Sequence, residues 1–331
     1  MYTKIFISTM LMLSVVGTAT AQLTIPDNKH ANVGVVYPIS TNGTQAKAYV
    51  NCFSLNLLAG FSAGETGLSL AGLSNIIFDS SSGVQIAGFS NHIGHYAGGV
   101  EIAGFLNTAG SSKGVEIAGF ANINAGKAGT QLSGYLNKAT DVDNQVSGFI
   151  NIAKKVKGVQ IAGLINIADS SDYPIAIFNF IKHGEMSIGL STDETLTSLV
   201  SFRSGGRRLY GIAGLGYNHK GQRQLAAWEA GLGAHLVSTD RFRLNIEGVS
   251  LGLTDFKHGD WVKQSLRILP AYRPNHRIEI FAGPTFNYLH ADNGQGEDIV
   301  GHYLWSEHDN HCYQALFFGA TGGITISLTN N

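Results

Sequence analysis

The side chains best suited to metal or acid–base chemistry gather in one segment near the C-terminus. Between residues 290 and 311, histidines and carboxylates alternate with glycine and asparagine. Imidazole and carboxylate groups bind zinc and other divalent cations, so His302, His308 and His311 are candidate metal ligands. Their spacing matches no well-defined metal motif, and a solvated polar loop between two strands explains the same composition.

Two further pairs contain the residue types of a catalytic site. His235 follows Glu229 on one strand, and His290 lies close to Asp292. A hydrolytic site also needs a nucleophile at a suitable distance from its base, and no such spacing rises above chance here. We therefore predict no catalytic residue, no cofactor and no enzymatic activity. A net charge of -1 also gives no bulk attraction to nucleic acid.

A second set of polar side chains occupies alternate positions of long strands in the C-terminal half. Between Leu225 and Val237, Trp228 and Leu232 share one face of an extended strand, and Glu229 lies on the other. Similar alternation follows in 241–253, in 277–289 and in the final strand. We expect the polar faces to form one network inside a barrel, made of Glu229, Arg241, Arg243, Glu247, Arg267, Arg277 and Glu279.

The strands that carry these residues are unusually long. Each alternating segment exceeds the roughly 5–6 residues of an ordinary globular strand, and turn residues separate the segments. This pattern is typical of a transmembrane β-barrel with apolar side chains toward lipid. Alternation does not reveal which face is wet, so a soluble barrel or sandwich stays open.

A repeat fills the first half of the chain. Residues 83–91 (GVQIAGFSN) recur at 99–107 and 114–122, with weaker copies up to residue 166. Val84, Ile86 and Gly88 are expected on one face, toward lipid in a barrel, and Phe89 on the other face with the polar row. The polar row comprises Gln85, Asn91, Glu101, Asn107, Glu116, Asn122, Gln131, Asn137, Gln160 and Asn166. Either antiparallel strands or stacked solenoid coils with an inward asparagine ladder fit these units.

The N-terminus predicts export. A weakly positive start and an apolar run end at Ala19-Thr20-Ala21, so residues 1–21 are expected to be a cleaved signal peptide. The chain has 331 residues, with 42 glycines and 14% charged residues. No later stretch supplies about 18 consecutive apolar residues, so any membrane crossing must use strands.

The repeat units resemble those of bacterial surface-repeat proteins, a family of predicted cell-surface or outer-membrane proteins. The resemblance covers about residues 50–180 and is carried by the pattern Gly-Val-Gln/Glu-Ile-Ala-Gly-Phe-x-Asn. The strands after residue 207 resemble outer-membrane β-barrels in general. The family implies no catalytic residues. One departure is the C-terminus, which lacks the final aromatic residue that many outer-membrane barrels use in assembly.

Together these observations predict an all-β protein. The leading interpretation is a single antiparallel barrel of the outer-membrane type over residues 22–331, with roughly 14 to 18 strands. Repeat-bearing strands would occupy 66–180, and long amphipathic strands 207–331. The alternative is a β-solenoid followed by a barrel-like or capping half.

The expected function is non-enzymatic, with a pore, structural or surface-display role in the outer membrane or at the cell surface. The expected partners are the lipid bilayer and the outer-membrane assembly machinery; the sequence indicates no ligand. A secreted solenoid adhesin is the alternative, and an outer-membrane enzyme acting on lipid is a weaker one.

Overall fold

The computed structural model describes residues 30–220, 225–254, 261–292, 302–309 and 312–329. The predicted signal peptide, residues 1–21, lies outside these ranges. Strands dominate the described part of the chain, and they belong to two sheets, one of 21 strands and one of nine. No helix among the described residues combines the length and the apolar character needed to cross a membrane.

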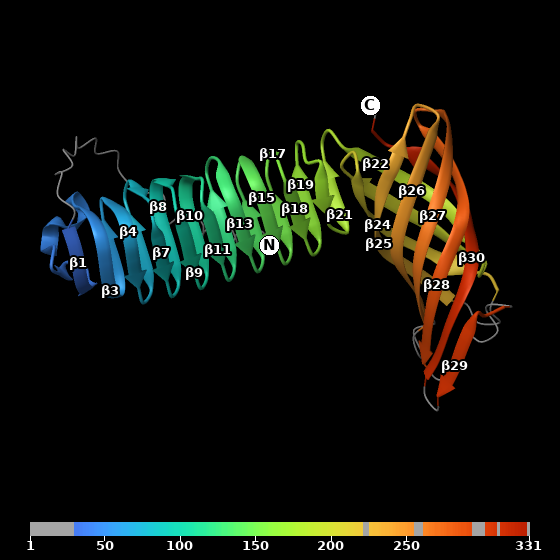
Figure 1. The fold of residues 1–331 in the computed structure, drawn as a ribbon, viewed down its shortest axis with the longest axis horizontal. Helices are drawn as coiled ribbons and strands as arrows, with labels where there is room; N and C mark the ends of the chain where they lie inside the picture. The colour runs from blue at the N-terminus through green and yellow to red at the C-terminus, as the bar shows by residue number, and fades with distance from the viewer. Residues whose placement is uncertain (1–29, 221–224, 255–260, 293–301, 310–311, 330–331) are drawn as a thin grey trace, which may run out of the picture.

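The N-terminal sheet is a parallel β-solenoid of about nine turns (Figure 1). It begins with β1 (His30–Val36), β2 (Ile39–Ser40), the short 3-10 helix η1 (Gly43–Ala48), β3 (Val50–Ser62), β4 (Gly64–Ala71), β5 (Ser74–Ile77), β6 (Ser80–Ser81), β7 (Val84–Ala87), β8 (Ser90–Ala97), β9 (Val100–Ala103) and β10 (Leu106–Ser112). It continues with β11 (Val115–Ala118), β12 (Ala121–Asn124), β13 (Ala128–Ser133), β14 (Leu136–Lys138), β15 (Asp141–Ser147), β16 (Ile150–Ile152), β17 (Lys155–Val156), β18 (Val159–Ala162), β19 (Ile165–Ala168), β20 (Tyr173–Ile175) and β21 (Phe178–Ile181).

Each repeat forms one coil with two short strands on opposite faces. Like residues stack in parallel register: Glu116 of β11 lies beside Glu101 of β9, and Asn122 of β12 beside Asn107 of β10. The first face comprises β4, β7, β9, β11, β13, β15, β18 and β20, and the second comprises β5, β8, β10, β12, β14, β16, β19 and β21. The solenoid alternative is therefore confirmed for the repeats, and they do not form antiparallel barrel strands.

A glycine sits at the corner between the two faces because neighbouring coils approach closely there. A Cβ atom added to Gly119 would collide with the carbonyl oxygen of Gly104, and one added to Gly104 would collide with that of Gly88. The chain turns at this corner, so the residue after the glycine leaves the alternating pattern. Phe89, predicted on the polar side, instead points outward and is 50% exposed.

The C-terminal sheet is a closed antiparallel barrel of eight strands. Its strands are β22 (Glu185–Asp193), β23 (Thr197–Gly205), β24 (Leu209–Asn218), β25 (Leu225–Ser238), β26 (Phe242–Thr254), β27 (Trp261–Asn275), β28 (Ile278–Asp292) and β30 (Cys312–Ser327). Pairing of β22 with β30 closes the barrel, and the short β29 (Trp305–Asp309) pairs with β30 alone. The barrel thus has eight strands, not 14 to 18, because the repeats form their own sheet.

The two faces of the barrel strands have the chemistry that the alternation predicts, and the structure shows which face is outside. Leu215 and Phe318 are 73% and 67% exposed on the outer surface, whereas Glu229 and Arg267 are 3% and 2% exposed inside. A soluble barrel would place these two sets the other way round. The outer surface is apolar and the interior carries the charges.

The two ends of the barrel differ in the length of their connections. Residues 206–208, 239–241 and 276–277 form short turns at one end, which is also where β22 begins and β30 ends. At the opposite end, β28 and β30 are 19 residues apart (293–311), with β29 between them. These are called the short-turn end and the long-loop end below.

The solenoid joins the barrel wall at the short-turn end (Figure 1). The backbone N–H of Asn179 in β21 donates to Ser204 Oγ of β23 at 2.9 Å. The guanidinium of Arg208, in the turn after β23, donates to the Tyr173 hydroxyl at 3.2 Å. Gly211 of β24 has no side chain where the carbonyls of Ala176 and Ile177 approach. The barrel wall therefore covers the last coil, which would otherwise be an open sheet edge.

Candidate functional site

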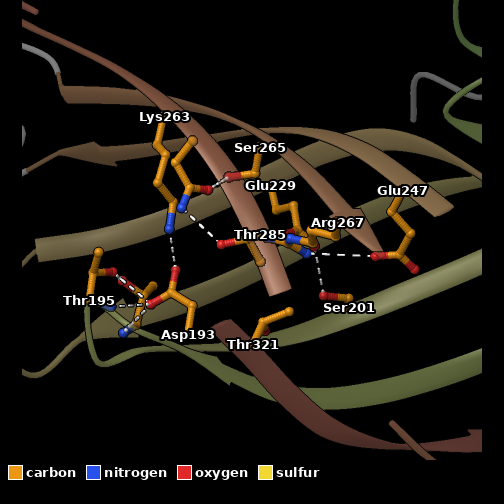
Figure 2. Close-up of polar contacts among 12 residues, drawn as sticks. Asp193, Thr195, Ser201, Glu229, Glu247, Lys263, Ser265, Arg267, Thr285 and Thr321 are labelled. Carbon is orange, nitrogen blue, oxygen red and sulfur yellow. Dashed lines mark hydrogen bonds and ion pairs between the residues drawn. The ribbon is translucent and has the colours of Figure 1, made fainter. Parts of the chain in front are cut away.

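The barrel interior holds a chain of buried ion pairs (Figure 2). Arg267 on β27 donates to Glu229 Oε2 on β25 at 2.6 Å and lies 3.7 Å from Glu247 on β26. Glu247 also accepts a bond from Arg203 Nε of β23 at 3.0 Å, and Ser201 donates to Glu229 at 3.1 Å. Four strands thus converge on alternating charges, each paired with an opposite one, as buried charges require.

A second group lies nearer the long-loop end and is centred on Lys263. This lysine is only 1% exposed, and its Nζ lies 2.6 Å from Asp193 and 2.8 Å from Glu194. Asp193 Oδ1 accepts hydrogen bonds from the backbone N–H groups of Thr195 and Thr197, which fixes the tight turn between β22 and β23. A Cβ at Gly319 would occupy the place of the Glu194 carboxylate, so this glycine makes room for the acid.

A third polar group lies at the short-turn end. Arg243 donates to both carboxylate oxygens of Glu185, at 2.8 and 3.1 Å, and lies 3.5 Å from Glu279. His235 Nδ1 lies 2.6 Å from Asn245 Oδ1. These residues line a small cavity of about 70 Å³, at which Arg273 and Arg277 also lie.

Toward the long-loop end, the interior also holds an apolar cluster beside the Lys263 group. Leu251, Leu289 and Phe317 are fully buried there, and Trp261 is 3% exposed. An eight-stranded barrel has an interior that side chains alone can fill. Apolar packing and ion pairs together therefore make this a plugged barrel.

The solenoid interior contains the predicted asparagine ladder. Asn91, Asn107 and Asn122 each donate to the side-chain oxygen of the next asparagine at 2.9 Å. Each amide also donates to a backbone carbonyl of the next coil, such as that of Ile117. All members are buried, so the ladder satisfies polar groups inside a structure with few large apolar core side chains. These contacts make the ladder a structural element.

A parallel column of glutamines and glutamates runs beside this ladder. Gln145 donates to Gln131 at 2.9 Å, and Gln131 donates to Glu116 at 2.9 Å. Glu101 stacks on Glu116, and both side chains are buried. Burial, together with the charge of Glu116, raises the pKa of Glu101 to about 9, and burial also raises the pKa of Glu116. A protonated carboxyl resembles an amide in shape and bonding, so the column tolerates acids at glutamine positions.

The structure brings most of the predicted network together. Glu229, Arg243, Glu247, Arg267 and Glu279 all face the barrel interior. Arg241 does not: it is exposed in the short turn before β26, because that strand begins only at residue 242. Arg277 is exposed beside the cavity in the turn before β28.

The predicted polar row of the repeats is buried at every position. These residues are Gln85, Asn91, Glu101, Asn107, Glu116, Asn122, Gln131, Asn137, Gln160 and Asn166. They line the solenoid core and not a barrel lumen.

Sequence reasoning missed Asp193, Glu194, Lys263, Arg203 and Glu185. Lys263 could have been found, since it alternates with Ser265 and Arg267 on one face of β27. Glu194 gave no such signal, because it lies in a turn and reaches Lys263 across 69 residues of sequence.

The candidate metal ligands do not assemble among the described residues. His302 and His308 are exposed, and His311 lies outside the described ranges. Within those ranges, no group of three or more histidine, cysteine or acidic side chains is placed to hold a metal ion. The metal site stays a sequence prediction.

Comparisons with protein-family models, curated proteins and solved structures find no match to this chain. The fold and its buried sites define an all-β protein made of a parallel β-solenoid joined to a plugged eight-stranded barrel.

Proposed function

We propose that the protein is a non-enzymatic outer-membrane β-barrel with a structural role, in which the barrel anchors the solenoid arm. The observation that carries this proposal is the distribution of side chains on the barrel, which is the reverse of that in a soluble barrel. Its outer surface exposes large apolar side chains such as Leu215 and Phe318, and its charges are paired inside. Such a surface is unfavourable in water and favourable in hydrocarbon. The resemblance to surface-repeat proteins and the predicted signal peptide support the same location.

Among the three roles expected from the sequence, the structure favours the structural one over the pore. The Arg267 and Lys263 ion pairs cross the middle of the barrel, and an apolar cluster packs beside Lys263. Pores of the outer membrane generally have many more strands than eight.

The topology also favours a side of the membrane for the solenoid. Outer-membrane barrels have short turns on the periplasmic side and long loops outside the cell. The solenoid enters the barrel at β22, at the short-turn end. We infer that the arm lies on the periplasmic side, which argues against display of the repeats on the cell surface.

A lipid-modifying enzyme is less well supported. His235, one of the two histidines considered for such a role, faces the interior, where it bonds to Asn245 and lies 3.8 Å from Glu185. A catalytic group for lipid must reach the outer surface of the barrel or its rim, which argues against His235. The other histidine, His290 on β28, is exposed, so a role for it stays a sequence hypothesis.

The proposal is tested by heat-modifiable migration of the purified protein during electrophoresis in dodecyl sulfate. A plugged barrel is expected to stay folded and migrate faster before boiling than after it. Identical migration of boiled and unboiled samples, from protein shown to be folded beforehand, would contradict the barrel anchor.

A further inference from the structure

The two edges of the solenoid have opposite chemistry. At one corner of each coil, which carries a glycine from Gly72 onward, an apolar residue points outward; this row, called the aromatic ridge below, comprises Leu57, Leu58, Leu73, Phe89, Phe105, Phe120, Tyr135, Phe149 and Leu164. Phe105 lies between Phe89 and Phe120 with ring centroids 4.9 and 4.8 Å away and nearly parallel rings. The ridge carries no charge, and its eight corners span roughly 34 Å at the usual strand spacing.

The opposite edge is polar and charged. It carries Lys113, Lys127, Asp141, Asp143, Lys154, Lys155, Lys157, Asp169 and Asp172. Lys157 and Asp143 form an exposed ion pair at 2.8 Å. Both edges belong to the same coils, so the solenoid is amphipathic across its width from about residue 110 onward; in the earlier coils this edge also exposes Phe78 and Tyr96.

The aromatic ridge meets the barrel at a level, measured along the strands, where the outer surface of the barrel is apolar. Next to the last corner, the Phe180 ring lies 6.5 Å from that of Phe202 on β23, three residues inside the end of that strand. Phe202 pairs with Ile188, which pairs with Ile326, and these isoleucines are 44% and 54% exposed on the outer surface. The ridge and this part of the outer surface therefore lie at one level.

The charged edge contacts the barrel closer to the short-turn end than the aromatic ridge does. Tyr173, which follows Asp172 in the last coil, accepts a bond from Arg208 in the short turn. In the same turn, Gly206 lies against the carbonyls of Ser171 and Asp172. Three residues of strand rise separate this level from that of Phe202, roughly 10 Å. The charged edge therefore meets the barrel at its short-turn rim.

We propose that the aromatic ridge inserts into the periplasmic leaflet of the outer membrane, so that the solenoid lies along the membrane instead of projecting from it. The occupant of the ridge is lipid, because the ridge continues the apolar surface of the barrel. The charged edge faces the aqueous periplasm. This inference rests on the proposed function, which places the barrel in a bilayer.

The test uses nitroxide spin labels on the full mature chain in phosphatidylethanolamine–phosphatidylglycerol nanodiscs. In a background with Cys52→Ser and Cys312→Ser, single labels are attached at Phe105→Cys on the ridge and at Lys127→Cys on the charged edge. Leu215→Cys on the barrel is the reference for lipid. Collision rates with oxygen, which partitions into lipid, and with a water-soluble nickel chelate report the surroundings of each label.

The proposal predicts an oxygen-to-nickel ratio several-fold higher at 105 than at 127, and close to that at 215. Phe120→Cys provides a second ridge position if the first variant folds poorly. A lipid-like ratio at 215 with an aqueous ratio at 105 and 120 would overturn the ridge insertion alone. An aqueous ratio at 215 would overturn the barrel anchor as well. Strong dipolar coupling between ridge labels of two chains would instead show a second copy on the ridge, and would also overturn the proposal.

Discussion

Buried acids in the solenoid make its stability depend on pH at the scale of single residues. The pKa of Glu101 is raised from 4.5 to about 9 by burial and by Glu116. Between these two values, the folded state keeps a proton that the unfolded chain has released. Stability contributed by this group is therefore fully present below pH 4.5, falls as pH rises, and levels off near pH 9.

Replacing Glu101 by glutamine is expected to remove this dependence. Glutamine already occupies the equivalent positions 131, 145 and 160, so the Glu101→Gln variant should fit the column. At pH 8 it should stabilise the surrounding coils by more than about 1.4 kcal/mol, the equivalent of one pKa unit, and at pH 5 by much less. Hydrogen exchange of solenoid peptides, compared with the unmodified chain at each pH, measures the effect. Asp172→Asn, at an exposed position, is the control; equal gains at both pH values would contradict the explanation.

Arg267 links two buried acids, and its loss should weaken the barrel. In the Arg267→Ala variant, Glu229 loses its 2.6 Å partner and Glu247 keeps only Arg203 as a cation. An uncompensated buried charge costs about 3–5 kcal/mol. The urea midpoint of the barrel in detergent, followed by tryptophan fluorescence, should fall accordingly. Arg241→Ala, at an exposed turn position, should change it little, and Arg267→Met with Glu229→Gln should recover much of the loss. No change in Arg267→Ala would refute the ion-pair assignment.

At the scale of elements, the coil corner depends on the absence of a side chain. A Cβ in the Gly119→Ala variant would meet the Gly104 carbonyl, whereas in Gly98→Ala the nearest backbone atom is 3.3 Å away. Separating two stacked coils disrupts ladder bonds on both faces, so Gly119→Ala should lose about 1–3 kcal/mol of local stability. Faster hydrogen exchange in residues 100–137 would show this. The Gly98→Ala variant should exchange at nearly the normal rate, and similar rates in both variants would contradict the close-approach argument.

The elements also show what the sequence could predict. In β25, β26 and β28 the two-residue period persists over most of each strand, so the faces of Trp228, Glu229 and Glu279 were predicted correctly. In the repeats the strands are only a few residues long, and the period breaks at the corner glycine. For this reason Gln85 and Asn91 were placed correctly, while Phe89 was assigned to the wrong face.

Which strands pair with one another was harder to derive from the sequence than which residues share a face of a strand. A 14- to 16-residue repeat fits either one coil or a strand with its turn, and the choice depends on whether like residues stack. Glu101 and Glu116 in register, for example, become compatible only when burial keeps Glu101 protonated. The predicted number of barrel strands was wrong for the same reason, because the repeats were counted as barrel strands.

At the scale of the whole molecule, the filled barrel predicts a protein that does not conduct ions. Lys263 with Asp193, and Arg267 with Glu229, occupy the interior in successive layers, and an apolar cluster that includes Phe317 and Leu251 packs beside Lys263. Planar bilayers containing the reconstituted protein should therefore show no discrete conductance steps. An eight-stranded barrel leaves no room for an aqueous path beside these side chains. Reproducible single-channel steps from heat-modifiable protein would contradict the plug.

The central claim is that the outer surface of this barrel belongs in a bilayer, and the most direct measurement is the solubility of the folded mature protein as detergent is removed. The exposed Leu215, Phe318 and Leu232 should drive association once micelles no longer cover them. We predict that the protein remains in the supernatant after ultracentrifugation above the critical micelle concentration and sediments below it. A folded protein that stays in solution as a monomer without detergent would contradict the account.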